Sequence, residues 1–203
     1  MTIRTPLCSL LACITLTAQA QVPDDYMQFN AQRERTSGTS MLVLGGWAVG
    51  NLVAGGIGMA TTPSGSEAFH FHQMNAAWNV VNLGIAVPAY LGARKRLRGP
   101  STLDIPGTFD AQRKVEAVYL INTGLDLAYM GAGLWLWENG RGDPTAKRSE
   151  MFQGFGTSLL LQGGFLFVYD LANYIVHARH WKRSRAGLWQ HLQFNGTSIR
   201  YAF

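Results

Sequence analysis

Apolar residues gather into four long windows along this chain. The windows cover about residues 41–60, 71–92, 115–137 and 151–177. Each is close to the ~20 residues that a helix needs to cross a hydrocarbon core about 30 Å thick. None of them shows the alternation of period two that is typical of half-buried strands. The pattern predicts an all-α protein, a membrane bundle of four spanning helices over residues 41–185.

The ends of the windows carry signals that are typical of helix ends at a membrane surface. Turn-forming Gly, Pro and Asn residues separate one window from the next. Tryptophans close the third window and follow the fourth, as expected for rings at the headgroup boundary: Trp135, Trp137, Trp181 and Trp189. These signals favour membrane spans over buried helices of a water-soluble protein.

The first 20 residues form a separate segment. Arg4 is followed by an apolar stretch of roughly 10 to 15 residues and then by Ala18-Gln19-Ala20. This order is typical of a secretory signal peptide, with cleavage expected before Gln21. The run LLAC, which ends at Cys13, also fits a lipoprotein processing site. The apolar stretch before that cysteine is short, so the lipoprotein site is the second choice.

Two polar segments flank the four windows. Residues 21–40 (QVPDDYMQFNAQRERTSGTS) are interpreted as an exposed segment that leads into the first window. Residues 186–203 form the tail, in which apolar and polar positions alternate around Asn195-Gly196. Asn-Gly is a strong signal for a two-residue hairpin turn. We therefore expect a short C-terminal hairpin or surface flap.

The windows also contain short internal matches. Two pairs carry them: Asn51-Leu52 to Gly58 with Asp126-Leu127 to Gly133, and Trp78 to Asn82 with Tyr169 to Asn173. If they mark a repeat, the bundle consists of two related helical hairpins in the same orientation. Matches this short also arise by chance, so a bundle without a repeat stays open.

Composition and charge agree with a lipid environment. Asp, Glu, Lys and Arg make up 14% of the residues, against about 25% in a typical soluble domain. The net charge of +5 comes largely from basic runs placed directly after apolar windows, where anionic lipid headgroups account for them. No nucleic-acid-binding motif accompanies these runs. The lipid bilayer is therefore the expected partner, and nucleic acid is not.

The basic residues predict an orientation that conflicts with the leader. One side of a four-span topology holds most of them: Arg94, Lys95, Arg96, Arg98, Arg113, Lys114, Arg179, Lys182, Arg183 and Arg185. The positive-inside rule places this side in the cytoplasm, together with residues 21–40. A cleaved signal peptide requires the opposite. We therefore expect a multi-pass protein of the bacterial inner membrane and leave its orientation open.

Polar side chains recur inside the windows at helical spacing. In the second window they lie three or four residues apart, which places them on one helix face, and the third and fourth windows repeat this spacing. Amides and carboxylates that face lipid are costly, so these faces should converge on the bundle axis. The candidate ligand-binding residues of this polar axis are Asn51, His72, Asn75, Asn79, Asn82, Asn122, Asp126, Asp170, Asn173 and His177.

The polar axis has two interpretations. The first is packing, because amide hydrogen bonds and small residues hold membrane helices together. Ridges of small residues at i, i+4 spacing support it: Gly46, Gly50, Ala54 and Gly58, and Gly124, Ala128 and Ala132. The second is binding of a cation, a proton or a polar ligand by Asp126 and Asp170, which have no Lys or Arg at comparable depth.

Metal and enzyme chemistry have less support. The pair His70 and His72 and the pair His177 and His180 are expected on opposite membrane sides, which excludes one four-ligand or haem site between them. The sequence contains no P-loop, dinucleotide fingerprint or zinc-protease motif, and Ser158 has no evident base. We expect no cofactor and no metal. An intramembrane enzyme stays as an alternative, because catalytic residues need not share a motif.

Two stretches resemble a known family. MLVLGGWAVGNLVAGG at 41–56 and FHQMNAAWNVVNLGIA at 71–86 resemble an uncharacterised family of small bacterial multi-pass membrane proteins, a domain of unknown function common in Bacteroidetes-like bacteria. The similarity covers about residues 27–185. It implies a helical membrane fold with a signal-like leader, and it transfers no activity and no site residue.

The sequence as a whole predicts a binding, assembly or accessory protein of the membrane with a polar bundle axis. Its partner beyond the bilayer would be a second copy of the chain, in a homo-oligomer, or another membrane protein. A small transporter of ions, protons or polar solutes that acts as an oligomer is the first alternative. An intramembrane enzyme is the second.

Overall fold

Four long helices make up most of the chain. The computed structural model describes residues 24–190, 192–194 and 199–201. The helices are α1 (Asp24–Thr61), α2 (Glu67–Arg96), α3 (Ile105–Gly142) and α4 (Ser149–Gln190). Two short antiparallel strands follow, β1 (Leu192–Phe194) and β2 (Ile199–Tyr201). The predicted four-helix bundle is confirmed, and paired strands lie where the C-terminal hairpin is expected.

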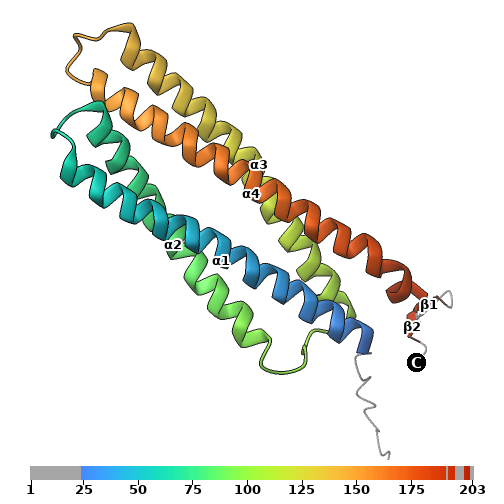
Figure 1. The fold of residues 1–203 in the computed structure, drawn as a ribbon. Coiled ribbons are helices and arrows are strands. Elements are labelled where there is room, and N and C mark those ends of the chain that lie inside the picture. The colour runs from blue at the N-terminus through green and yellow to red at the C-terminus, as the bar shows by residue number, and fades with distance from the viewer. Residues whose placement is uncertain (1–23, 191, 195–198, 202–203) are drawn as a thin grey trace, which may run out of the picture.

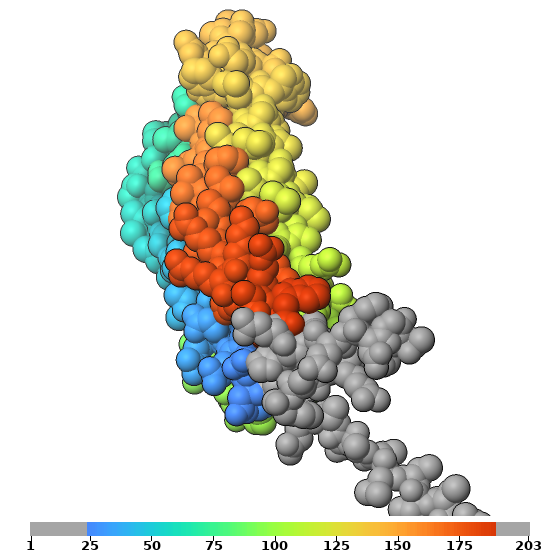
Figure 2. Space-filling model, turned by 90° about the vertical axis from the view of Figure 1, so that its right-hand side faces the viewer, coloured from blue at the N-terminus to red at the C-terminus, as the bar shows by residue number. Residues whose placement is uncertain are grey.

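The helices pack as two antiparallel hairpins in one elongated bundle (Figure 1). α1 packs along α2, and α3 packs along α4. The two hairpins meet mainly where α2 packs against α4, and Figure 2 shows α4 between α3 on one side and the α1–α2 hairpin on the other. No Cα atom of α2 comes within 8 Å of one in α3. This separation leaves room for a cleft between these two helices.

Local sequence signals determine where the helices begin. The Ser66 hydroxyl caps α2 by accepting a hydrogen bond from the Phe69 N–H at 3.2 Å. Asp104 caps α3 in the same way, with its Oδ1 2.8 Å from the Gly107 nitrogen. Both are preferred N-cap residues because they satisfy backbone donors that have no partner within the helix. The turn before α2 contains Gly65 at a φ of +82°, a conformation that glycine adopts without strain.

Many polar side chains lie inside the bundle, and many large apolar ones lie on its surface. Large hydrophobic side chains are widely exposed on all four helices, including Val53 (57%), Val80 (61%), Ile121 (62%) and Val168 (65%). Asn79 and Gln162, in contrast, are completely buried. A water-soluble monomer seldom exposes so much contiguous apolar surface. In lipid, the same distribution satisfies both kinds of side chain.

Three of the four helices are long and apolar enough to cross a membrane: α1, α2 and α4. α3 is not among them, although the sequence predicts four spans. Asn122 and Asp126 lower its mean hydropathy, yet Asp126 is buried and Asn122 is half-buried. The outer face of α3 exposes Leu120, Ile121 and Leu127. Its low hydropathy therefore arises largely from the face turned towards the bundle.

The interpretation of residues 21–40 as an exposed segment is wrong for the part that the structure describes. α1 already begins at Asp24, and Tyr26 and Phe29 are buried against Leu188 of α4. Ile105, Phe109 and Trp181 pack around this cluster. The polarity of the segment hid a helix with one buried face. A helix of 38 residues is about 57 Å long, so the bundle extends well beyond a hydrocarbon core of about 30 Å.

The described ends of the chain lie together at one end of the bundle. The Tyr26 hydroxyl donates a hydrogen bond to the Leu188 carbonyl at 3.0 Å. The end of α2, the start of α3 and the end of α4 also lie there, with the basic residues that define the predicted cytoplasmic side. The predicted signal peptide, residues 1–20, lies outside the described residues. Its conflict with the basic end therefore stays open.

The predicted ridges of small residues are largely wrong. A Cβ added at Gly46, Gly50 or Gly124 would meet nothing within 4 Å, whereas Gly58 does lie against the ring of His72. The close approach of α3 and α4 occurs instead at Gly133, where an added Cβ would lie 2.9 Å from the Gly156 carbonyl oxygen. Spacing identified glycine-rich faces, but it could not show which of these faces a neighbouring helix covers.

Candidate functional site

A buried glutamine joins three of the helices. Gln162 of α4 is fully buried, and its Oε1 accepts a hydrogen bond from the Trp47 indole N–H of α1 at 2.9 Å. Its Nε2 donates to Oδ1 of Asn75 in α2 and lies 3.5 Å from Oδ1 of Asn51 in α1. The side chain amide is thus a junction between the two hairpins. Gln162 is not among the residues that the sequence predicts for the polar axis, which are Asn, Asp and His, although it precedes Asp170 by about two helical turns.

Asparagines extend this junction along α2. Asn75 Nδ2 donates to the Asn51 carbonyl at 3.3 Å, and Asn79 Nδ2 donates to the Asn75 carbonyl at 2.8 Å. Asn82 Nδ2 then donates to Asn79 Oδ1 at 3.1 Å. Four predicted residues, Asn51, Asn75, Asn79 and Asn82, therefore lie in one hydrogen-bonded row. The bond from Asn75 to Asn51 joins α2 to α1, and the other two lie within α2.

Two acidic side chains meet where α3 packs against α4. Asp126 is 2% exposed and Asp170 is 4% exposed. The Asp170 carboxyl interacts with the side chains of both Asp126 and Asn122. A hydrogen bond between two carboxyl groups needs a proton on at least one of them, because a carboxylate has no donor. Asp126 Oδ2 has no hydrogen-bond partner among the residues that the structure describes.

The acid pair lines a cleft between α2 and α3 with a volume of about 660 Å³. Its walls are mainly apolar side chains, among them Val81, Ile85 and Ala89 of α2 and Val115, Val118 and Leu125 of α3. Side chains from α1 and α4 also line it, among them Leu44 and Leu166. Its polar lining includes Asn82, Tyr119, Asn122, Asp126, Tyr169 and Asp170. The cleft thus combines apolar walls with a buried acidic group.

The two ends of the cleft differ. At one end the rings of Trp78 and Tyr129 meet edge to face, with centroids 4.8 Å apart, and bridge α2 to α3. At the other end Glu34 accepts from Arg96 Nε at 2.7 Å and from Arg33 Nη2 at 3.3 Å. Lys114 also lines this charged mouth. On the helical rise, Lys114 and Tyr129 are roughly 22 Å apart along α3.

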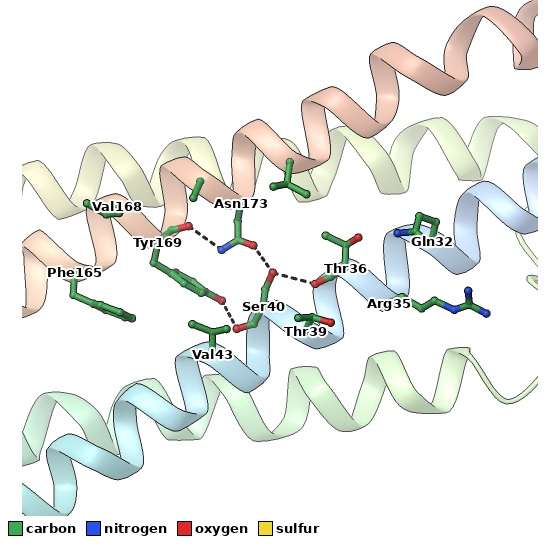
Figure 3. A pocket seen from close by; sticks show the side chains of 12 residues that line it. Gln32, Arg35, Thr36, Thr39, Ser40, Val43, Phe165, Val168, Tyr169 and Asn173 are labelled. Carbon is green, nitrogen blue, oxygen red and sulfur yellow. Dashed lines mark hydrogen bonds between the residues drawn. The ribbon is translucent and has the colours of Figure 1, made fainter.

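A second hollow, a groove of about 540 Å³, lies between α1 and α4 (Figure 3). The Tyr169 hydroxyl donates to the Ser40 carbonyl at 2.9 Å, and Asn173 Nδ2 donates to the Tyr169 carbonyl at 2.8 Å. The Ser40 hydroxyl also contacts Asn173 Oδ1. Tyr169 lines both the groove and the cleft. The predicted residue Asn173 therefore lines the groove and not the cleft.

The two predicted histidines line neither the cleft nor the groove. His177 is fully buried and stacks on Tyr119 with ring centroids 5.6 Å apart. Neither of its ring nitrogens has a hydrogen-bond partner within residues 24–190. His72 is half-buried beside Gly58, near the turn that joins α1 to α2. The ten predicted residues thus occupy a packing row, a cleft, a groove and two separate histidine positions.

The other members of the two histidine pairs, His70 and His180, lie at opposite ends of the bundle. His70 stacks edge to face on Phe155, near the start of α4, while His180 stacks on Phe29, near the start of α1. The His180 Nε2 atom also lies 3.2 Å from the Phe29 carbonyl oxygen. Within the described residues, no group of three or more His, Cys, Asp or Glu side chains has the arrangement of a metal site.

The acid pair and the asparagine row lie in a part of the chain that matches a protein-family model. A model described as a family of unknown function (DUF6992) matches residues 43–171. The chain belongs to the DUF6992 family. The DUF6992 match runs from α1 to α4 and includes Gln162, Asp126 and Asp170, but not the extension of α1 over residues 24–42. No curated protein and no solved structure matches the chain. The predicted membership of a family of unknown function is confirmed, and a bacterial origin stays a prediction.

Proposed function

We propose that this protein is a membrane-embedded binding protein whose ligand occupies the cleft between α2 and α3. The single observation that carries the proposal is Asp126, a residue that lines a cleft of about 660 Å³ and whose buried Oδ2 atom has no hydrogen-bond partner among the described residues. Buried polar atoms normally have a hydrogen-bond or ionic partner. A ligand with a polar group on an apolar body would provide that partner and fill the space between the walls.

The cleft has the general features of a ligand site. Small-molecule sites are concave, mostly apolar and supplied with a few convergent polar groups. Here Asp126 and Asn122 of α3 approach Asp170 of α4 below walls of aliphatic side chains. The asparagine row around Gln162, by contrast, is already satisfied by its own hydrogen bonds. We assign the row to packing and the cleft to binding.

The proposal places all four helices in the membrane, α3 included. The exposed Leu120, Ile121 and Leu127 would face lipid, while Asn122 and Asp126 would face the cleft. The cleft would then open sideways to the bilayer, and its charged mouth would lie near the headgroups. The basic end would face the cytoplasm of a bacterial inner membrane. The protein would act alone, as a homo-oligomer or with another membrane protein.

Native mass spectrometry of the detergent-purified full chain tests this proposal. The double variant Ala89→Trp/Val118→Trp places two indole rings in the cleft, while Leu91→Trp/Ile121→Trp places the same rings on exposed positions that do not line it. The wild type and the second variant should retain a co-purified small molecule, and the first should not. Absence of any bound molecule from the wild type, or its retention in the filled variant, would contradict the proposal.

The acid pair also favours a second function, transport of a proton or a small cation. Intramembrane acids without a basic partner are common in proton and ion pathways, and Asp126 and Asp170 are buried at the interface of α3 and α4. Proteoliposomes with an internal pH dye and an imposed pH gradient measure this activity. Transport predicts proton flux in the wild type that Asp126→Asn/Asp170→Asn abolishes. Equal flux in both, or none above empty liposomes, would reject it.

A further inference from the structure

We infer that the ligand of the α2–α3 cleft is a lipophilic cation, a positively charged group carried on an apolar body. The inference rests on the proposed function, because it requires the cleft to be the binding site. It adds the chemical class of the ligand, which follows from the charge of the acid pair and from the aromatic rings around it.

No ion pair joins the acid pair to the basic residues that line the cleft, Arg33, Arg96 and Lys114. A pair of carboxyls that shares one proton carries a single negative charge. Arg33 and Arg96, the two arginines of the lining, both pair with Glu34 at the mouth. Lys114, the other basic residue of the lining, lies roughly 18 Å from Asp126 along α3. A buried charge is costly unless it is paired, so a cationic ligand group would be stabilised here.

Aromatic rings line the same cleft as the acid pair. Four of them line the same cleft: Trp78, Tyr119, Tyr129 and Tyr169. Tyr129 follows Asp126 by about one helical turn and meets Trp78 at 4.8 Å between centroids. Tyr169 directly precedes Asp170 and lies 6.4 Å from the Tyr119 ring. The faces of such rings attract cations within about 6 Å and recognise quaternary ammonium groups.

The basic residues at the charged mouth favour the opposite kind of ligand, an anionic amphiphile. Glu34 neutralises part of the charge of Arg33 and Arg96 at this mouth. The Arg96 side chain is 58% exposed, and Lys114 is also exposed. Charges in such positions are screened by water and salt. The acid pair is buried, where the same charge interacts more strongly. A cationic ligand is therefore favoured, and preferential binding of an anionic one would contradict the inference.

Two probes with the same shape and opposite charge separate these ligands. Tetraphenylphosphonium and tetraphenylborate each carry four phenyl rings around one central atom, with one positive or one negative charge. Isothermal titration calorimetry of the full chain in detergent micelles, after subtraction of protein-free micelles, gives both affinities. We expect the wild type to bind tetraphenylphosphonium at least about tenfold more tightly than tetraphenylborate, as a buried charge pair predicts.

A pair of variants locates the source of this preference. Asp126→Asn/Asp170→Asn removes the charge of the acid pair and should weaken tetraphenylphosphonium binding at least about tenfold. Asp110→Asn/Asp143→Asn makes the same chemical changes at two exposed acids outside the cleft and should leave that binding unchanged. Circular dichroism establishes that the variants are helical. The comparison of the two probes on the wild type needs no variant and holds even if the first one does not fold.

The outcomes separate this inference from the proposed function. If the wild type binds tetraphenylborate as tightly as tetraphenylphosphonium, or more tightly, the inference of a cationic ligand is wrong. It is also wrong if Asp126→Asn/Asp170→Asn binds tetraphenylphosphonium as tightly as the wild type. If the wild type binds both probes equally and the filled variant Ala89→Trp/Val118→Trp binds neither, the cleft is the binding site but its ligand is not specifically a cation. If the filled variant binds tetraphenylphosphonium like the wild type, the cleft itself is wrong.

Discussion

Replacement of Gln162 by Met tests whether the amide junction holds the two hairpins together. Met has nearly the same length and a similar helix propensity, so the change removes the amide and little else. It deprives the Trp47 indole N–H and Asn75 Oδ1 of their partners. The contact to Asn51 at 3.5 Å is too long to contribute much. Interhelical hydrogen bonds in membrane proteins contribute about 0.6 kcal/mol on average and up to about 1.7. Loss of two predicts a destabilisation of about 1–3 kcal/mol.

A hydroxyl on the same helix provides the control. Ser158 is as deeply buried as Gln162, and its hydroxyl has no hydrogen-bond partner among residues 24–190. Ser158→Ala removes a buried polar group that makes no bond, so stability should stay within about 0.5 kcal/mol of the wild type or rise. Unfolding by sodium dodecyl sulfate in mixed micelles, followed by circular dichroism, measures both variants. A Gln162→Met variant as stable as the wild type, or less affected than Ser158→Ala, would refute the junction.

Three further predictions follow from the packing, the described chain ends and the loops. Gly156→Ala places a Cβ 2.6 Å from backbone atoms of α3 and should destabilise the protein by about 1–3 kcal/mol. Gly164→Ala, whose Cβ would meet nothing within 4 Å, should be neutral or stabilising. Equal unfolding midpoints of the two variants would contradict this prediction. Tyr26→Phe removes the hydrogen bond to the Leu188 carbonyl and should speed hydrogen exchange of the backbone amides in the last turn of α4, which mass spectrometry measures. Unchanged exchange would argue against this contact. Thr145→Cys, between α3 and α4, should react with a membrane-impermeant maleimide in intact cells. Ser101→Cys, between α2 and α3 at the basic end, should react only after permeabilisation. The reverse pattern would exclude a cytoplasmic basic end.

The helices could be predicted from the sequence, but their full lengths could not. Window length and turn residues indicate four helices because lipid requires about 20 apolar residues for each span. The extension of α1 over residues 24–40 has no such signature. Its buried face is mixed, with Tyr26 and Phe29 beside the polar Asn30 and Arg33, and the polar groups are satisfied by hydrogen bonds to α3 and within α1. A helix with that composition looks like a solvated segment until its partners are known.

The sequence indicated which side chains turn inward, but not how they are grouped. The cost of polar groups in lipid places Asn79, Asp126 and Asp170 inside, and all three are buried. Helical spacing cannot distinguish an asparagine that is satisfied within the bundle from a carboxyl that lines a cleft. That distinction depends on α2 standing away from α3. It also depends on Gln162, whose role is visible only when α1, α2 and α4 are brought together.

The central claim is that lipid surrounds the exposed apolar faces of all four helices. Nitroxide labels at Val53, Val80, Ile121 and Val168, one on each helix, test it in reconstituted bilayers after Cys8 and Cys13 are replaced by Ser. The accessibility of each label to oxygen, which partitions into lipid, is compared with that to a water-soluble nickel chelate. The account predicts high oxygen and low nickel accessibility at all four sites. High nickel accessibility at Ile121 would remove α3 from the membrane, and the same result at all four sites would contradict the account.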